Sequence, residues 1–162
     1  MAAVPALALP AATAATAATS VDDSASVAAS TCYQPCIQGI RFATHDGYDR
    51  LVFDFNGKTD FTTETNTTGL YTPLSGQDTY LTTKGASYLF IRMTPASFYD
   101  DAGNQVFTSP MQQVVDLPTL KGIQLTGVHA GVISFGISLG PSTRYNAFQL
   151  TQPDRLVIDV YR

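Results

Sequence analysis

Apolar and polar positions alternate along most of the chain, and the pattern is sharpest in a stretch that occurs twice. Residues 48–55 read YDRLVFDF and residues 153–160 read PDRLVIDV. Both copies are rich in β-branched and aromatic residues with a period of two, so each predicts a β-strand. The apolar face of the two copies holds Leu51, Phe53, Phe55, Leu156, Ile158 and Val160. The repeat predicts either two similar strands of one β-domain or two pseudo-symmetric halves.

The opposite face of the repeat carries an arginine and an aspartate four residues apart in each copy. If the two strands pair, Arg50 lies opposite Asp159 and Arg155 lies opposite Asp54. We therefore expect both arginines to hold the strands in register. The competing hypothesis is a ligand site on this face, made by Tyr48, Arg50 and Arg155.

Further alternating segments are separated by turn signals. Strands are expected over 40–44, 86–93 and 132–139, and a last hairpin joins 144–150 to the second repeat copy. Asn56-Gly57 is a strong two-residue hairpin signal, which predicts that residues 61–65 return beside the first copy. The pattern predicts eight to eleven short strands, no helix of ordinary length, and an all-β fold: an antiparallel β-sandwich or open barrel.

The first 31 residues differ from the rest of the chain. They contain thirteen alanines and no aromatic residue, so we expect a disordered tail over 1–31 followed by one β-domain over 32–162. Residues 1–9, MAAVPALAL, are similar to the apolar part of a secretory signal peptide without its positive n-region, which predicts the remnant of a signal and a secreted protein; the alternative is a flexible Ala-Thr linker. No stretch is long enough to span a bilayer.

The net charge and the two cysteines limit the kinds of partner and site that the protein can have. The net charge is −4 without a basic stripe, which argues against nucleic acid as a partner. In an exported protein, Cys32 and Cys36 are expected to form a disulfide. A redox motif is disfavoured by the CYQPC spacing, and a metal site lacks further ligands. A lipid anchor on Cys32 is a weaker alternative.

The sequence contains no recognisable catalytic constellation. His45 and His129 both fall in predicted turns, no serine lies in a nucleophile-elbow pattern, and Asp100 and Asp101 are adjacent in a turn. We therefore expect no enzymatic activity, no catalytic residues, no cofactor and no metal. Three tyrosines near turns, Tyr48, Tyr71 and Tyr145, are of a type that stacks on sugars, although packing is the commoner role.

These segments resemble a known family. Gly39-Ile40-Arg41, the stretch 45–55 (HDGYDRLVFDF), the segments 116–118 and 131–136, and the terminal 152–160 (QPDRLVIDV) are similar to the AMIN domain. They are closest to the AMIN-like domain of secreted bacterial proteins and lipoproteins. The resemblance covers residues 37–162 and implies a β-sandwich with internal pseudo-symmetry. The segment between the two halves is longer than in the short AMIN domain.

The resemblance also implies a function. AMIN domains of cell-wall amidases and of some secretion pores are non-catalytic modules that target proteins to peptidoglycan. By this resemblance we expect a secreted, cell-wall-associated module that binds peptidoglycan or another cell-wall glycan. The alternative is a protein-interaction domain that engages an envelope protein through a sheet edge.

Overall fold

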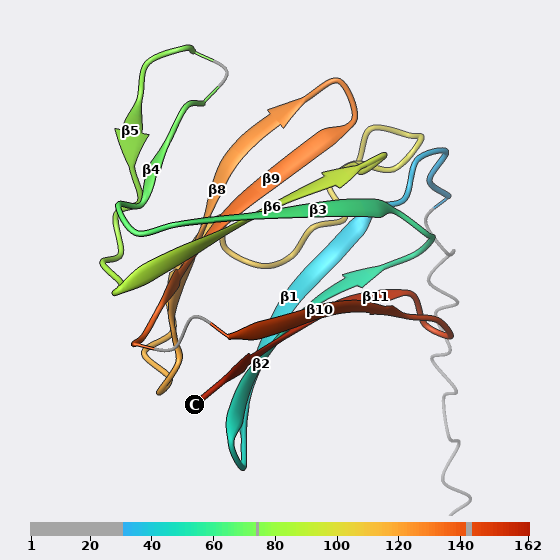
Figure 1. Ribbon diagram of the computed structural model, residues 1–162. Helices are drawn as coiled ribbons and strands as arrows, with labels where there is room; N and C mark the ends of the chain where they lie inside the picture. Colours follow the sequence, from blue (N-terminus) through green and yellow to red (C-terminus); the bar gives the residue numbers. More distant parts are fainter. Residues whose placement is uncertain (1–30, 74, 142–143) are drawn as a thin grey trace, which may run out of the picture.

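The computed structural model describes residues 31–73, 75–141 and 144–162. The signal-like start and residues 1–30 of the Ala-rich tail lie outside these ranges. The described residues form eleven antiparallel strands and no helix, as expected (Figure 1). The strands are β1 (Ile37–His45), β2 (Tyr48–Phe55), β3 (Asp60–Asn66), β4 (Leu70–Tyr71), β5 (Thr79–Tyr80), β6 (Ser87–Thr94), β7 (Gln112–Val114), β8 (Leu120–His129), β9 (Val132–Leu139), β10 (Tyr145–Leu150) and β11 (Arg155–Tyr161).

Two sheets pack face to face as a sandwich. The four-stranded sheet has the order β1-β2-β11-β10, and the five-stranded sheet has the order β3-β6-β9-β8-β7. Figure 1 shows the two sheets as separate layers, with the small β4–β5 sheet at one side. Each main sheet has two central strands, β2 and β11 in one and β6 and β9 in the other, with one further strand on either side. The larger sheet also has β7 at its edge, next to β8. This arrangement agrees with the predicted sandwich and its internal pseudo-symmetry.

The two copies of the repeat are the central strands of the four-stranded sheet. β2 and β11 pair antiparallel, and Val52 lies opposite Val157 at the centre. The Arg-Leu-Val-apolar-Asp order then places Arg50 opposite Asp159 and Asp54 opposite Arg155. The two copies of the repeat are therefore related by a local two-fold axis that passes between Val52 and Val157. The β1–β2 hairpin lies on one side of this axis and the β10–β11 hairpin on the other.

The core lies between the two sheets and is built from the predicted apolar face. Phe53 of β2 and Phe135 of β9 are fully buried, with ring centroids 5.3 Å apart. A one-residue slip of either strand would turn its whole apolar set outward, so burial fixes the register. The buried set includes all six predicted positions: Leu51, Phe53, Phe55, Leu156, Ile158 and Val160.

The hairpin predicted at Asn56-Gly57 does not form. β3 does not return beside β2; it crosses to the other sheet and pairs with β6. Both edges of β2 are already occupied by β1 and β11, so no edge remains for a returning strand. Asn56 instead binds the chain before β1, because its backbone N–H donates to the Cys36 carbonyl and its Oδ1 accepts from the Cys36 N–H at 2.7 Å.

The expected disulfide joins Cys32 and Cys36 at this same end of the sandwich. The Cys36 side chain is fully buried. The loop that the disulfide closes is held by the neighbouring turn, because the Tyr33 N–H donates to the Asp101 carboxylate at 2.6 Å and the Asp101 N–H donates to the Thr31 carbonyl at 2.9 Å. The disulfide thus anchors the start of the domain to the rest of the sandwich.

A strap, residues 67–86, joins β3 to β6 and carries β4 and β5. It lies over the outer face of the five-stranded sheet, and Leu81 is buried there with only 2% of its surface exposed. Leu81 packs on Gly136 of β9, where a Cβ atom would lie 2.6 Å from its Cδ2 atom. The absence of a side chain at Gly136 therefore lets Leu81 of the strap approach the sheet closely.

Two further hydrogen bonds fasten the strap to the sheet. The Thr82 N–H donates to Gln124 Oε1 at 2.9 Å, and Ser138 Oγ donates to the Thr83 carbonyl at 2.6 Å. The strap therefore covers one end of the outer face and leaves the other end open.

Candidate functional site

Tyr48 and Arg50 lie side by side on the outer face of the four-stranded sheet. Arg50 donates from Nε and Nη2 to the two carboxylate oxygens of Asp159, both at 2.7 Å, and the Asp159 side chain is 7% exposed. The guanidinium carbon also lies 5.3 Å from the centre of the Tyr48 ring. The hydrogen bonds to Asp159 raise the Arg50 pKa above its ordinary value, against the effect of desolvation. This predicted ion pair is confirmed, and it occupies Nε and Nη2 of Arg50 with Asp159.

The symmetry-related pair between Arg155 and Asp54 does not form. Arg41 of β1 donates from Nε and Nη2 to the Asp54 carboxylate, both at 2.6 Å. Arg155 turns back and donates from Nε to the Pro153 carbonyl at 3.2 Å. The prediction fails because β1 supplies a competing arginine next to Asp54.

The three residues proposed as a ligand site do not form one site. Tyr48 pairs with Tyr161, and Arg155 lies six positions further along β11. At the rise of a β-strand this places Arg155 about 20 Å from the Tyr48 row. Only Tyr48 and Arg50 are brought together.

Asp49, between Tyr48 and Arg50, faces inward and is fully buried. Its carboxylate accepts hydrogen bonds from the Thr119 N–H at 2.5 Å, the Thr119 hydroxyl at 2.7 Å and the Thr44 hydroxyl. Arg162 lies 3.4 Å away. Burial acts to raise the Asp49 pKa, but the hydrogen bonds from Thr44 and Thr119 hold the pKa below its ordinary value. This carboxylate joins β2 to the start of β8 and has a structural role.

The open end of the other sheet's outer face forms a groove of about 920 Å³. Its floor is β3, β6, β9 and β8, and one wall is the first part of the strap. The groove lies within the range of volumes usual for ligand sites, although its lining is more polar than is usual for drug-like ligands. Its lining includes Thr62, Glu64, Tyr71, Thr72, Phe90, Arg92, Thr126, Val128, His129 and Ser134.

One row of side chains crosses the groove floor. Arg92 of β6 lies opposite Thr62 of β3 on one side and opposite Ser134 of β9 on the other. Gly127 of β8 continues the row beyond Ser134, and a Cβ atom placed there would meet nothing within 4 Å. The row therefore combines one cation, two hydroxyls and open space.

An aromatic pair lies next to this row. The rings of Tyr71, from the strap, and Phe90, on the floor, have centroids 6.1 Å apart. The Tyr71 oxygen accepts a hydrogen bond from Gln124 Nε2 at 3.2 Å, which orients the ring. Of the three tyrosines considered for sugar stacking, Tyr71 lines the groove. Tyr145 instead donates to the Thr63 hydroxyl at 3.0 Å, between the two sheets.

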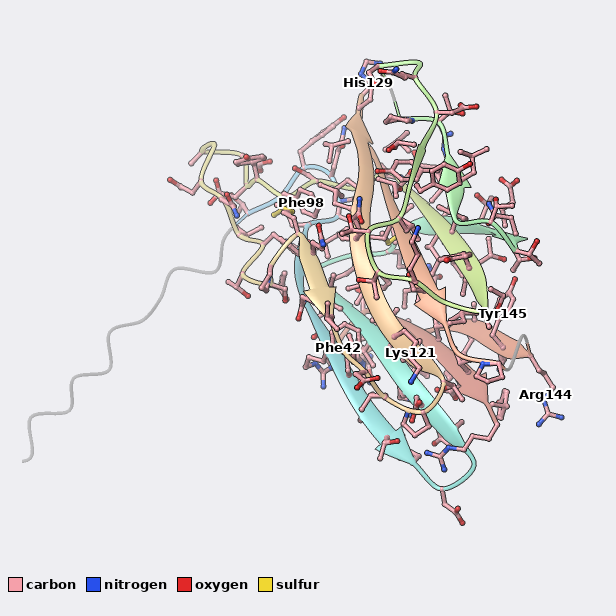
Figure 2. The ribbon with its side chains drawn as sticks, turned by 90° about the vertical axis from the view of Figure 1, so that its left-hand side faces the viewer. Phe42, Phe98, Lys121, His129, Arg144 and Tyr145 are labelled. Carbon is pink, nitrogen blue, oxygen red and sulfur yellow. A yellow bond between two sulfur atoms is a disulfide. The ribbon has the colours of Figure 1, made fainter. Side chains whose placement is uncertain are left out.

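The two histidines are far apart. His45 is the last residue of β1 and stacks on Tyr48 at a centroid distance of 4.7 Å, whereas His129 is the last residue of β8 and lines the groove. Figure 1 places the β1–β2 and β8–β9 turns at opposite ends of the molecule, and Figure 2 shows His129 at one tip. Among residues 31–73, 75–141 and 144–162, no three His, Cys, Asp or Glu side chains gather as metal ligands would.

Only part of this groove is predictable from the sequence. Tyr71 is one of the three tyrosines suggested for sugar stacking, whereas Arg92 and Ser134 fall without distinction within the strands expected over 86–93 and 132–139. No signal in the sequence marks Arg92, because the outward face of an antiparallel strand is ordinarily polar. The groove also depends on the strap, whose short strands have no clear periodicity.

One protein-family model matches most of the chain. The family model described as the AMIN-like domain matches residues 35–162. No curated protein matches the chain. The part of the chain described above contains no helix long and apolar enough to cross a membrane.

Proposed function

Because the chain belongs to the AMIN-like domain family, we propose that it is a secreted, non-catalytic module that binds peptidoglycan or a related wall glycan in the groove beside the strap. The family is one of cell-envelope domains, and the Cys32–Cys36 disulfide fits an oxidising, extracellular or envelope location. The similarity of residues 1–9 to the apolar part of a secretory signal peptide also supports export.

The observation that carries the proposal is the chemistry of the groove. Glycans present alternating apolar ring faces and hydroxyl edges. The groove offers aromatic rings, Tyr71 and Phe90, beside several hydroxyl groups and one cation, Arg92. Aromatic rings pack on the apolar face of a sugar, and the threonine and serine hydroxyls can each donate and accept at its edge.

The same lining supports binding without hydrolysis. Glycoside hydrolysis ordinarily uses two carboxyl groups that flank the scissile bond. The described lining of the groove contains a single carboxylate, Glu64. His129, at the end of β8, lines the groove and has no carboxylate partner among the described hydrogen bonds and ion pairs.

Sedimentation with purified sacculi tests the proposal. The wild-type domain should pellet with protein-free sacculi, and Tyr71→Ala should weaken binding by about threefold to tenfold. Tyr33→Ala is the matched control, because Tyr33 is 92% exposed and is not part of the groove lining. Equal retention of Tyr71→Ala and Tyr33→Ala would contradict binding in the groove, and no retention of the wild type would contradict glycan binding altogether.

A second candidate function is supported by the sheet edges. β3 and β10 each pair on one side only within the described chain, and both lie at the same side of the sandwich, where Tyr145 contacts Thr63 and Gln149 binds the Thr59 carbonyl. An envelope protein could add a strand to either edge. A photo-crosslinker at Asn146 of β10 should then capture that protein in native envelopes, while protein-free sacculi should not retain the domain.

A further inference from the structure

Arg92 is the cation of the groove that no acid neutralises. It is exposed on the floor of the groove, and it makes no ion pair or hydrogen bond with the residues that the structure describes. Arg41, Arg50, Lys121 and Arg162 all have carboxylate partners. Glu64, the carboxylate of the groove lining, lies opposite Phe90 and is the diagonal neighbour of Arg92, but the two side chains form no ion pair. The guanidinium is therefore available to a ligand.

The two residues that flank Arg92 are suited to the same ligand. Thr62 and Ser134 are its direct register partners on β3 and β9. Side chains of directly opposed residues lie about 5 Å apart at Cβ, so both hydroxyls stand within reach of a group bound by the guanidinium. Neither hydroxyl has a hydrogen-bond partner among the described residues, so both are free to donate.

We propose that the Thr62–Arg92–Ser134 row binds a carboxylate of the wall glycan, on a sugar or on an attached peptide, while a sugar ring packs beside Phe90 and Tyr71. Arginine binds a carboxylate through two parallel N–H donors, and flanking hydroxyls supply further donors to the same oxygens. Phe90 is two residues from Arg92 on the same face of β6, about 7 Å along the strand. That spacing fits a carboxylate attached to the sugar that covers the aromatic pair.

This inference rests on the proposed function and makes it more specific. A wall glycan offers the carboxylate from two sources: an acid substituent on the sugar itself, such as a lactyl ether or a uronic acid, and the free carboxyl groups of attached peptides. The chemistry of recognition is the same for both sources.

Isothermal titration with three probes tests the inference. The probes are a glycan oligomer with lactyl carboxylates and no peptides, a neutral N-acetylglucosamine oligomer of equal length, and the free stem peptide. The wild-type domain should prefer one carboxylated probe to the neutral oligomer by about tenfold to a hundredfold. Tight binding of the oligomer assigns the carboxylate to the sugar, and tight binding of the peptide assigns it to the stem.

Arg92→Gln should reduce the affinity for the preferred carboxylated probe to that for the neutral oligomer, whereas Arg92→Lys should retain part of the preference. Gly127→Leu offers an independent test, because it adds a side chain where a Cβ atom meets nothing within 4 Å and should block the row without disturbing the fold. Equal affinity of the wild type for the carboxylated and neutral oligomers, unchanged by Arg92→Gln, would overturn the carboxylate site and leave glycan binding intact. Absence of all glycan binding by the wild type would instead overturn the proposed function.

Discussion

Arg50 and Asp159 are separated by 109 positions in the sequence, yet they form a two-point ion pair across the centre of the four-stranded sheet. The pair joins the two copies of the repeat, because each copy contributes one of the two residues. Its counterpart at Asp54 and Arg155 is broken by Arg41. The register therefore places an arginine opposite an aspartate at both positions, but a direct ion pair forms at only one of them.

The two arginines should differ in their effect on stability. Arg50→Ala leaves the largely buried Asp159 carboxylate without its partner and should lower the free energy of unfolding by about 1–3 kcal/mol. Arg155→Ala removes one long hydrogen bond to Pro153 and should change it by less than about 0.5 kcal/mol. Urea unfolding of both variants checks this difference. Equal losses in the free energy of unfolding would contradict the different contacts described for the two arginines.

Phe53→Ala tests the core. Phe53 is fully buried and packs against Phe135 of the opposite sheet. Its truncation should cost about 3–5 kcal/mol, a large part of the stability of a domain of this size. Thermal and urea unfolding should both show the loss, and Tyr33→Ala, at an exposed position, should leave stability unchanged. A loss below about 1 kcal/mol at Phe53 would contradict the assigned packing.

The stability of the domain should decrease in acid partly because of Asp49. The folded-state pKa of Asp49 is lowered, so the unfolded chain binds its proton more readily as pH falls. The contribution is present above the unfolded pKa of about 4 and is lost as pH falls through the lower folded pKa. Asp49→Asn should be less stable than the wild type at pH 7. The difference between the two proteins should shrink between about pH 5 and pH 2 in urea titrations, and a constant difference would contradict this role.

Reduction of the Cys32–Cys36 disulfide should weaken the fold only modestly. The closed ring is short, so the cross-link restricts the unfolded chain little, and the expected loss is about 1–3 kcal/mol. Unfolding of Cys32→Ser, which leaves the buried Cys36 in place, measures the effect of the bond. A variant that does not fold would show that the loop contacts at Asn56 and Asp101 depend on the bond.

The sequence predicted the strands of the repeat and their inward faces because each has an uninterrupted period of two and one face that must be buried. It predicted the wrong partner for residues 61–65, because a turn signal such as Asn56-Gly57 carries no information about whether the edges of β2 are already occupied. It also could not show that Arg41 would take Asp54 from Arg155, since that competition depends on the sheet order.

The groove was the least predictable feature for a related reason. It arises where the strap passes over the outer face of another sheet, and the strap is held by single contacts such as Leu81 on Gly136. Such contacts join segments far apart in the chain and leave no periodic pattern. Arg92 becomes notable only when its neighbours on β3 and β9 are known.

The central claim is that the groove beside the strap, and not the repeat face, binds the wall glycan. Amide chemical-shift mapping during titration with soluble peptidoglycan fragments tests this claim most directly. The account predicts shifts that cluster at Thr62, Tyr71, Phe90, Arg92 and Ser134, with the outer face of β2 and β11 unaffected. Shifts that cluster instead around Tyr48 and Tyr161, or no shifts at saturating fragment, would contradict it.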